Sequence, residues 1–230
     1  AKQKLDTAPS SAGIHRPRLG TGGGFANLFF WDTAFTAMWA HYYSAELPVW
    51  DSLDNLYRLQ SASGLINREN RPDHTAVWPE YHPAAVAPPV LSWAELKLDA
   101  LRPDIDRIRR VYPALARHHG RIQDLLQAPD RLHFHDSPGS GTANLPRWPR
   151  DWEDDGTGIV LRDDGTQMWG YPGDPQSRLN NQGRWVDLSA QMALDADCLA
   201  TMAGMLDQPE EAGAWRSEHA GLASVINDTM

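Results

Sequence analysis

The chain has 230 residues, of which 41% are hydrophobic and 22% charged, so it can form one large domain or two small ones. Its formal net charge is -9 and its Lys and Arg residues are scattered, which argues against nucleic acid or an anionic membrane as a partner. Its single cysteine, Cys198, excludes an intramolecular disulfide and a cysteine-based zinc site.

Six helices are predicted from apolar residues that recur at helical spacing. In chain order they span residues 32–44, 51–61, 90–101, 104–126, 188–207 and 210–227. Asp51 or Ser52 is expected to cap the second helix, and Pro88-Pro89 to begin the third, where a missing N–H costs nothing. The segment before the first helix, residues 1–24, is rich in Gly, Ser and Pro and is expected to be flexible, which leaves residues 25–230 as one domain.

Short turns and long loops alternate along this series of helices. The two long loops cover residues 62–89 and 127–187, and the other connections are short. Within the second loop, residues 159–162 and 167–170 are the best candidates for a small hairpin, across Asp163-Asp164-Gly165. Paired helices with long loops on alternate connections predict an all-α toroid whose long loops gather at one end, and loops of this length are typically functional.

Tryptophan is unusually frequent, with ten residues in the chain. Four of them lie in predicted loops, where the packing of helix faces does not require them: Trp78, Trp148, Trp152 and Trp169. Large aromatic planes stack well on the apolar faces of sugar rings, so this placement favours a carbohydrate cleft.

A carboxylate lies inside an aromatic run, Phe29-Phe30-Trp31-Asp32-Thr33-Ala34-Phe35, where the first helix begins. Burying an unpaired carboxylate among such rings costs several kcal/mol, and a sugar offsets this cost because its hydroxyls donate to the carboxylate. Two interpretations of Asp32 stay open here, a helix cap and a sugar ligand.

Carboxylates are the main candidates for chemistry, because no Cys–His or Ser–His pattern is present. Hydrolysis of a glycosidic bond needs two carboxyl groups, one protonated and one ionised. The candidates are Asp32, Glu69, Glu80, Asp136, Asp151, Glu153, Asp154 and Asp155. The last three also fit a solvated acidic turn.

A metal site at His133-Phe134-His135-Asp136 is considered and not expected. Successive residues of an extended segment face opposite sides, so the two histidines share a side that Asp136 does not, and no third ligand is apparent. Neither a metal nor another cofactor is expected.

Several stretches, in order and with consistent spacing, resemble the trehalase-like and processing-glucosidase-like glycoside hydrolases, families 37 and 63. The likeness is greatest to their compact bacterial relatives, which include mannosylglycerate and glucosylglycerate hydrolases. It extends from about residue 25 to residue 206. The matching stretches are FFWD at 29–32, the helix 54–60 followed by GLINRE at 64–69, APPVLSWA at 87–94, GSGTANLPRW at 139–148 and WVDLSAQ at 185–191.

The resemblance implies a fold and an activity. The fold is a paired-helix toroid of the alpha/alpha six-barrel type, of which this chain would be the N-terminal part. The activity is hydrolysis of an α-glucosidic or α-mannosidic bond with inversion, on a small sugar or glycoside. Trp31 and Asp32 would hold the sugar whose bond breaks, and the Arg68-Glu69 pair would lie at the mouth of the cleft. The cleft would also be lined by Arg147 and Trp148.

One departure from the family pattern bears on catalysis. The position of the family's general-acid aspartate is occupied by Ala143, beside Asn144, and alanine has no proton to donate. The family's glutamate base belongs to a C-terminal half, so the base is not in this chain. A catalytically dead carbohydrate-binding homologue is therefore the alternative to an enzyme, and a purely structural helical scaffold is a third possibility.

Two further expectations concern the cellular location of the protein and the role of Cys198. No run approaches 18 apolar residues and no charged-then-apolar leader opens the chain, so the cytoplasm is the expected location. Cys198 lies within a predicted helix and is expected to be a small core thiol rather than a nucleophile.

Overall fold

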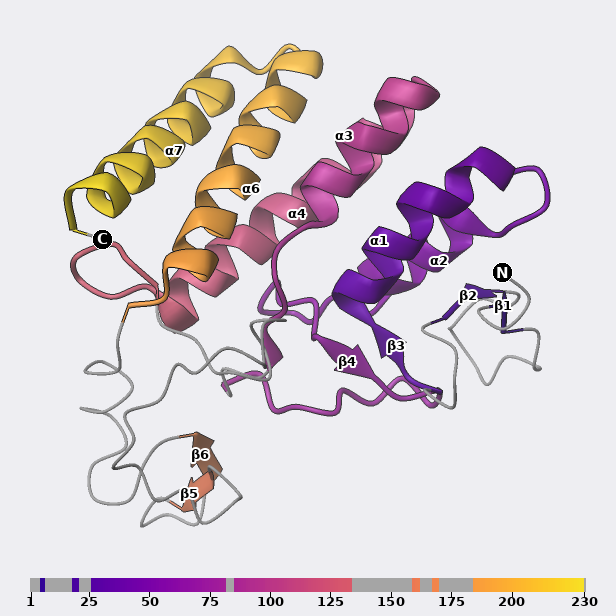
Figure 1. Cartoon of the computed structure of the whole chain (residues 1–230), viewed down its shortest axis with the longest axis horizontal. Helices are drawn as coiled ribbons and strands as arrows, with labels where there is room; N and C mark the ends of the chain where they lie inside the picture. Colours follow the sequence, from indigo (N-terminus) through magenta and orange to yellow (C-terminus); the bar gives the residue numbers. More distant parts are fainter. Residues whose placement is uncertain are drawn as a thin grey trace.

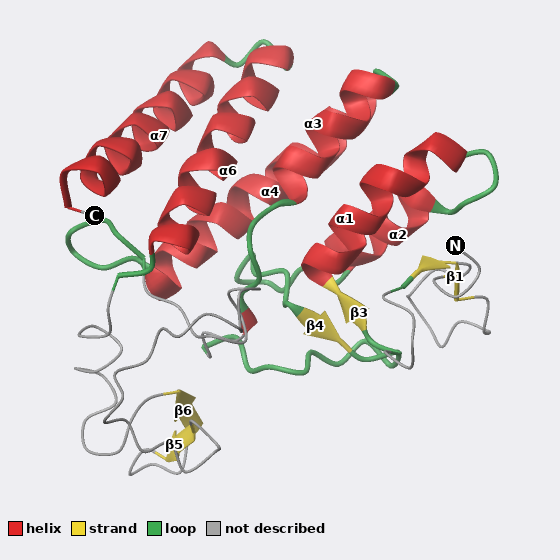
Figure 2. Cartoon of the chain, viewed as in Figure 1, coloured by secondary structure: helices red, strands yellow, loops and turns green. Residues whose placement is uncertain are grey.

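The computed structural model describes residues 5–6, 18–20, 26–81, 85–133, 159–161, 167–169 and 184–229. In this part of the chain six α-helices dominate: α1 (Phe30–Ala40), α2 (Val49–Arg58), α3 (Leu91–Leu101), α4 (Ile105–Leu126), α6 (Val186–Met205) and α7 (Pro209–Thr229). The predicted all-α class is thereby confirmed (Figure 2).

The strands are short and form two-stranded antiparallel sheets. The pairs are β1 (Leu5–Asp6) with β2 (Arg18–Leu19), β3 (Leu28–Phe29) with β4 (Glu69–Asn70), and β5 (Ile159–Leu161) with β6 (Gln167–Trp169). The third pair is the hairpin predicted inside the second long loop, with Val160 opposite Met168.

The helices form three consecutive pairs (Figure 1). α1 packs against α2, α3 against α4, and α6 against α7, while α1, α3 and α6 lie side by side. The N-termini of α1, α3 and α6 point to the same end, and the long loop after α2 runs along that end. The predicted rhythm of paired helices is therefore present in the described part. The loop after α2 lies at one end of the helices, and the gathering of both long loops at that end stays a prediction, because most of the second loop lies outside the described residues.

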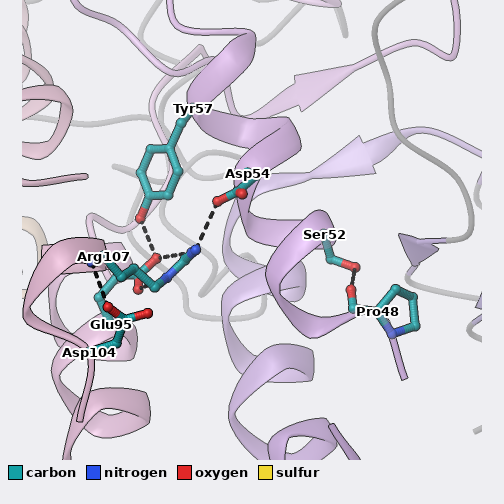
Figure 3. Close-up of polar contacts among 7 residues, drawn as sticks. All are labelled: Pro48, Ser52, Asp54, Tyr57, Glu95, Asp104 and Arg107. Carbon is teal, nitrogen blue, oxygen red and sulfur yellow. Dashed lines mark hydrogen bonds and ion pairs between the residues drawn. The ribbon is translucent and has the colours of Figure 1, made fainter. Parts of the chain in front are cut away.

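A buried ion-pair network joins three of these helices (Figure 3). Arg107 on α4 donates to Asp54 on α2 at 2.9 Å and to both carboxylate oxygens of Glu95 on α3 at 2.7 Å each. Tyr57 also donates to Glu95, at 2.8 Å. The guanidinium carbon of Arg107 lies 4.5 Å from the ring centre of Trp50. Because each buried charge is paired, the network fixes the first helix pair against the second.

The starts of the first three helices differ from the prediction, and α1 begins at Phe30 rather than at residue 32. α2 begins at Val49 with Pro48 as N-cap, so neither Asp51 nor Ser52 caps it. Ser52 instead lies inside the helix, where its hydroxyl donates to the Pro48 carbonyl at 2.6 Å. α3 begins at Leu91, so both prolines precede the helix, and Val90 is its N-cap.

The long helix α4 starts and continues as its sequence predicts. Asp104 is its N-cap and accepts from the backbone N–H of Arg107 at 3.0 Å. Pro113 lies inside α4 without ending it, because the packed apolar face compensates for the lost hydrogen bond.

Part of the N-terminal segment is packed onto the helices. Leu19 is fully buried and its backbone N–H donates to the Ser52 hydroxyl at 2.8 Å, while Arg18 donates to the Ala26 carbonyl at 2.8 Å. Here the structure differs from the predicted flexible loop, because Leu19 supplies apolar area to the core. The boundary at residues 24 and 25 stays a prediction.

Cys198 is buried on α6, as predicted, and burial raises the pKa of its thiol to about 12. A thiol held in its protonated form is a poor nucleophile. Within the described ranges, no helix is long and apolar enough to cross a membrane.

Candidate functional site

The candidate site begins at the N-terminus of α1, inside the aromatic run. α1 starts at Phe30, and its N-cap is Phe29, which makes no side-chain cap hydrogen bond. Asp32 is therefore the third residue of the helix and not its cap, so the cap interpretation is wrong. Its carboxylate is half-buried in the first turn, where the partial positive charge of the helix N-terminus favours an anion.

The two family-like segments near the N-terminus of the chain lie against each other. β3 and β4 pair with Phe29 opposite Glu69, and the Phe30 backbone N–H donates to the Arg68 carbonyl at 2.9 Å. Residues 31–32 and 68–69, well separated in sequence, are thereby brought to one end of the helix layer. The structure thus brings together four of the predicted site residues, Trp31, Asp32, Arg68 and Glu69.

Arg68 and Glu69 each have a partner in this region. The guanidinium carbon of Arg68 lies 4.7 Å from the centre of the Trp78 ring, a cation–π distance. Glu69 accepts from the Asn27 side-chain amide at 2.6 Å. Trp78, one of the loop tryptophans predicted to serve a carbohydrate cleft, therefore lies against Arg68, and its role in binding sugar stays a prediction.

Asparagine side chains organise this loop, and sequence reasoning does not single them out. The Asn67 amide donates to the Trp78 carbonyl at 2.7 Å, and its oxygen accepts from the Glu69 backbone N–H at 3.2 Å. Asn70 donates to the Asn67 carbonyl at 3.3 Å. The one sequence signal is the position of Asn67 directly before the Arg68-Glu69 pair, whereas nothing local marks Asn27.

Aromatic side chains continue from the site along one face of α1 to α3. Trp31 and Phe35 meet edge to face with ring centres 5.8 Å apart, and Phe35 meets Trp93 of α3 in the same way at 6.1 Å. Phe35 and Trp39 remain 42% and 38% exposed, although both are large and apolar. The residues at positions 31, 35 and 39 share one helix face, because they are four apart.

The remaining predicted carboxylates are less informative. Glu80 accepts from the Ser63 hydroxyl at 2.7 Å, within the same loop as Glu69. The other candidates lie outside the described residues: Asp136, Asp151, Glu153, Asp154 and Asp155.

The predicted residues of the Ser-Gly loop also lie outside the described residues, so their roles stay predictions. They are Ala143, Asn144, Arg147 and Trp148.

His133, from the motif considered for a metal, is fully buried at the end of the described stretch 85–133. Burial lowers its pKa to about 3, and its backbone N–H donates to the Ser189 hydroxyl at 2.9 Å. Among the residues that the structure describes, no cluster of three His, Cys, Asp or Glu side chains is arranged to hold a metal ion.

Known proteins resemble this chain in sequence pattern and in fold. A family model described as "Mannosylglycerate hydrolase MGH1-like glycoside hydrolase domain" matches residues 26–230. No curated protein matches the chain by sequence.

Solved structures from Thermus thermophilus share the fold. GH63 mannosylglycerate hydrolase in complex with glucose has a TM-score of 0.63 at 20% identity, over 94% of this chain and 60% of that one. The same hydrolase with Tris and D-glycerate has a TM-score of 0.57 at 18% identity, over 97% and 61%. An uncharacterized conserved protein has a TM-score of 0.62 at 17% identity, over 97% and 61%.

These similarities confirm the predicted fold. At 17% to 20% identity they speak for the fold alone, which is that of GH63 alpha/alpha-barrel enzymes. The chain spans about 60% of the length of these solved relatives, in keeping with the three helix pairs of its described part.

Proposed function

Since this chain belongs to the family of mannosylglycerate hydrolase MGH1-like glycoside hydrolase domains, we propose that it supplies the sugar-binding part of a glycosidase. The bond cleaved would be α-mannosidic or α-glucosidic, and cleavage would proceed with inversion. The solved relatives hold glucose in one case and Tris with D-glycerate in another, so a small sugar or glycoside is the substrate class that we expect.

The observation that supports this proposal most directly is the hydrogen bond from Phe30 to the Arg68 carbonyl. It joins the start of α1, with the half-buried Asp32 and an aromatic face led by Trp31, to the strand that carries Glu69. Carboxylates accept from sugar hydroxyls and aromatic planes cover the apolar faces of the ring. A purely structural scaffold does not need a carboxylate beside an aromatic face at the end of the helices where the long loop runs.

The chemical step would need two carboxyl groups, about 6.5–9.5 Å apart in an inverting enzyme so that a water fits between the base and the sugar. By the family resemblance, Ala143 would stand at the position of the general acid, and the family's glutamate base would belong to a C-terminal half. We therefore expect that this chain binds sugar without cleaving it. A catalytically dead carbohydrate-binding homologue is the second candidate, and Ala143 is what favours it.

Calorimetric titration of the chain with mannosylglycerate and with glucose tests the proposal. Binding that weakens when Asp32 is changed to Asn would support it. If a folded chain bound neither compound, both candidates would be contradicted, and a purely structural helical scaffold would be the remaining interpretation.

A further inference from the structure

We propose that His118, buried on α4, is a positioning residue that holds the Trp31-Asp32 turn and the Arg68-Glu69 strand together as one unit. The inference rests on the proposed function for its consequence, because these two segments form the candidate sugar site. Its structural content can be measured without any sugar.

His118 contacts both segments at once. Its ring centre lies 5.1 Å from that of Phe30, the first residue of α1, at an interplanar angle of 39°. Its Nδ1 accepts from the Ile66 backbone N–H at 3.1 Å, two residues before Arg68. Phe30 in turn donates to the Arg68 carbonyl at 2.9 Å. The three contacts close a triangle, so neither segment can shift without breaking one of them.

The loop approaches α4 closely just before the Ile66 contact. Gly64 has a φ of +96°, and a Cβ added to it would lie 2.8 Å from the Arg117 carbonyl oxygen. The Gln60 side chain donates to the carbonyls of Gly64 at 2.8 Å and Ala114 at 2.7 Å, and it accepts from Arg117 at 2.6 Å. These contacts bring the loop to the turn of α4 that carries His118.

An apolar residue at position 118 would remove the acceptor of the Ile66 N–H. Ile66 is fully buried, and its N–H needs an acceptor because an unsatisfied buried donor is costly. A Phe or Leu at position 118 would pack against Phe30 but would provide no acceptor for the Ile66 backbone N–H. The acceptor is thus the property that distinguishes positioning from filling space.

The charge state of His118 agrees with this role. Burial lowers its pKa to about 4; Asp195 on α6 opposes this effect, and His119 on the same helix adds to it. The ring is neutral near pH 7, so Nδ1 keeps the lone pair that accepts from Ile66, and the proton lies on Nε2, which is buried without a hydrogen-bond partner among the described residues.

Two substitutions separate the acceptor from the ring. His118→Phe keeps an aromatic ring against Phe30 and removes the acceptor, whereas His118→Asn removes the ring and keeps an oxygen near the Nδ1 position. Leu98→Ala, at a fully buried site on α3, serves as the control for general loss of stability. Amide hydrogen exchange of Ile66 and Phe30, followed by NMR in the full chain, is the readout.

We expect the Ile66 and Phe30 amides to speed up in exchange about tenfold more in His118→Phe than in Leu98→Ala. In His118→Asn their exchange rates should return most of the way to those of the unchanged chain. Mannosylglycerate affinity should follow the same order, falling about tenfold in His118→Phe, because a displaced binding group loses its geometry. Amides in His118→Phe that exchange no faster than in Leu98→Ala would overturn the inference, as would an Asn variant that exchanges as fast as the Phe variant. If the unchanged chain binds no sugar, the proposed function fails while the amide result still decides the role of His118.

Discussion

Asp32 and Asp51 occupy the same position in two successive helices, since each is the third residue of its helix and directly follows a tryptophan. Neither is an N-cap, because Phe29 and Pro48 hold those places. They differ in setting: Asp32 is half-buried beside the β3–β4 pair, whereas Asp51 is exposed at the start of α2. The chain therefore contains its own control for the effect of a first-turn carboxylate.

The first prediction uses this pair. Asp32→Asn and Asp51→Asn should each cost about 0.3–1 kcal/mol of stability, because each removes a charge that the helix dipole favours. Sugar affinity, measured by calorimetry with mannosylglycerate, should fall about tenfold in Asp32→Asn alone, since charge-assisted hydrogen bonds are the stronger ones. Equal affinities in the two variants would reduce Asp32 to a purely structural carboxylate.

The second prediction concerns Glu69, whose carboxylate accepts from Asn27. Glu69→Gln keeps an oxygen for Asn27 and removes the charge, so the fold should lose little and mannosylglycerate affinity should fall severalfold. Glu80→Gln is the matched control, because Glu80 lies in the same loop and likewise accepts from a neutral side chain, the Ser63 hydroxyl. A Glu69→Gln variant that binds as tightly as Glu80→Gln would assign Glu69 to the solvated surface.

The sequence predicts helices well where the signal is local and fails where it is not. The apolar stripe of α4 lies within the segment whose structure it predicts, and the predicted helix 104–126 is confirmed apart from its first residue, because Asp104 is the N-cap. The predicted start of the first helix, residue 32, is too late, because the β3–β4 ladder decides where the extended chain ends. That ladder depends on Glu69 and Asn70, which lie far along the chain from the helix that they help to begin.

The same distinction applies to the candidate site. Trp31, Asp32 and the Arg68-Glu69 pair stand out by their residue types and by a family resemblance. Asn27 and His118 do not, because their roles depend on partners 42 and 52 residues away in sequence. A histidine on a helix face has no local feature that tells a buried acceptor from an ordinary core side chain.

The third prediction tests the close approach of the loop to α4. Gly64→Ala should destabilise the chain by about 1–3 kcal/mol, because φ is positive there and the added Cβ would meet the Arg117 carbonyl. Gly120→Ala, within α4 and with nothing within 4 Å of its added Cβ, should instead stabilise by up to about 1 kcal/mol. Urea unfolding of both variants gives the two signs, and a neutral Gly64→Ala would mean that the loop stands off the helix.

The fourth prediction is a pH dependence of stability. Burial lowers the pKa of His118 to about 4 from an ordinary value of 6.5. Above pH 6.5 neither the folded nor the unfolded state binds this proton. Between pH 6.5 and 4 only the unfolded state binds it, so the free energy of unfolding falls as the pH falls, and below pH 4 the loss levels off.

Over that window His118 should account for a loss of about 3 kcal/mol, at about 1.4 kcal/mol for each unit of pKa difference. His118→Asn cannot titrate, so its unfolding free energy should fall by that much less between pH 6.5 and 4. Urea titrations at both pH values measure the difference. Equal losses in the two proteins would mean that His118 takes up its proton over the same pH range in the folded and the unfolded state, contrary to a lowered pKa in the folded state.

The last prediction is that Ala143→Asp restores hydrolysis in a form of the protein that also carries the family's glutamate base. A glycosidic oxygen leaves poorly unless it is protonated in the transition state, and a positioned acid contributes about 10²–10⁴-fold. Neither Ala143 nor the amide of Asn144 can supply that proton near neutral pH. The Asp variant should therefore raise kcat about 10²-fold or more with little change in KM, because the acid acts mainly on the transition state. It should also give the pH profile a new alkaline limb, where the added carboxyl loses its proton.

Ala143→Asn is the control, since it adds bulk without a proton to donate. An Asp variant no faster than this control, in a protein that binds mannosylglycerate, would mean that the acid belongs elsewhere in the loop, with Asp136 and Glu153 as the next positions to test.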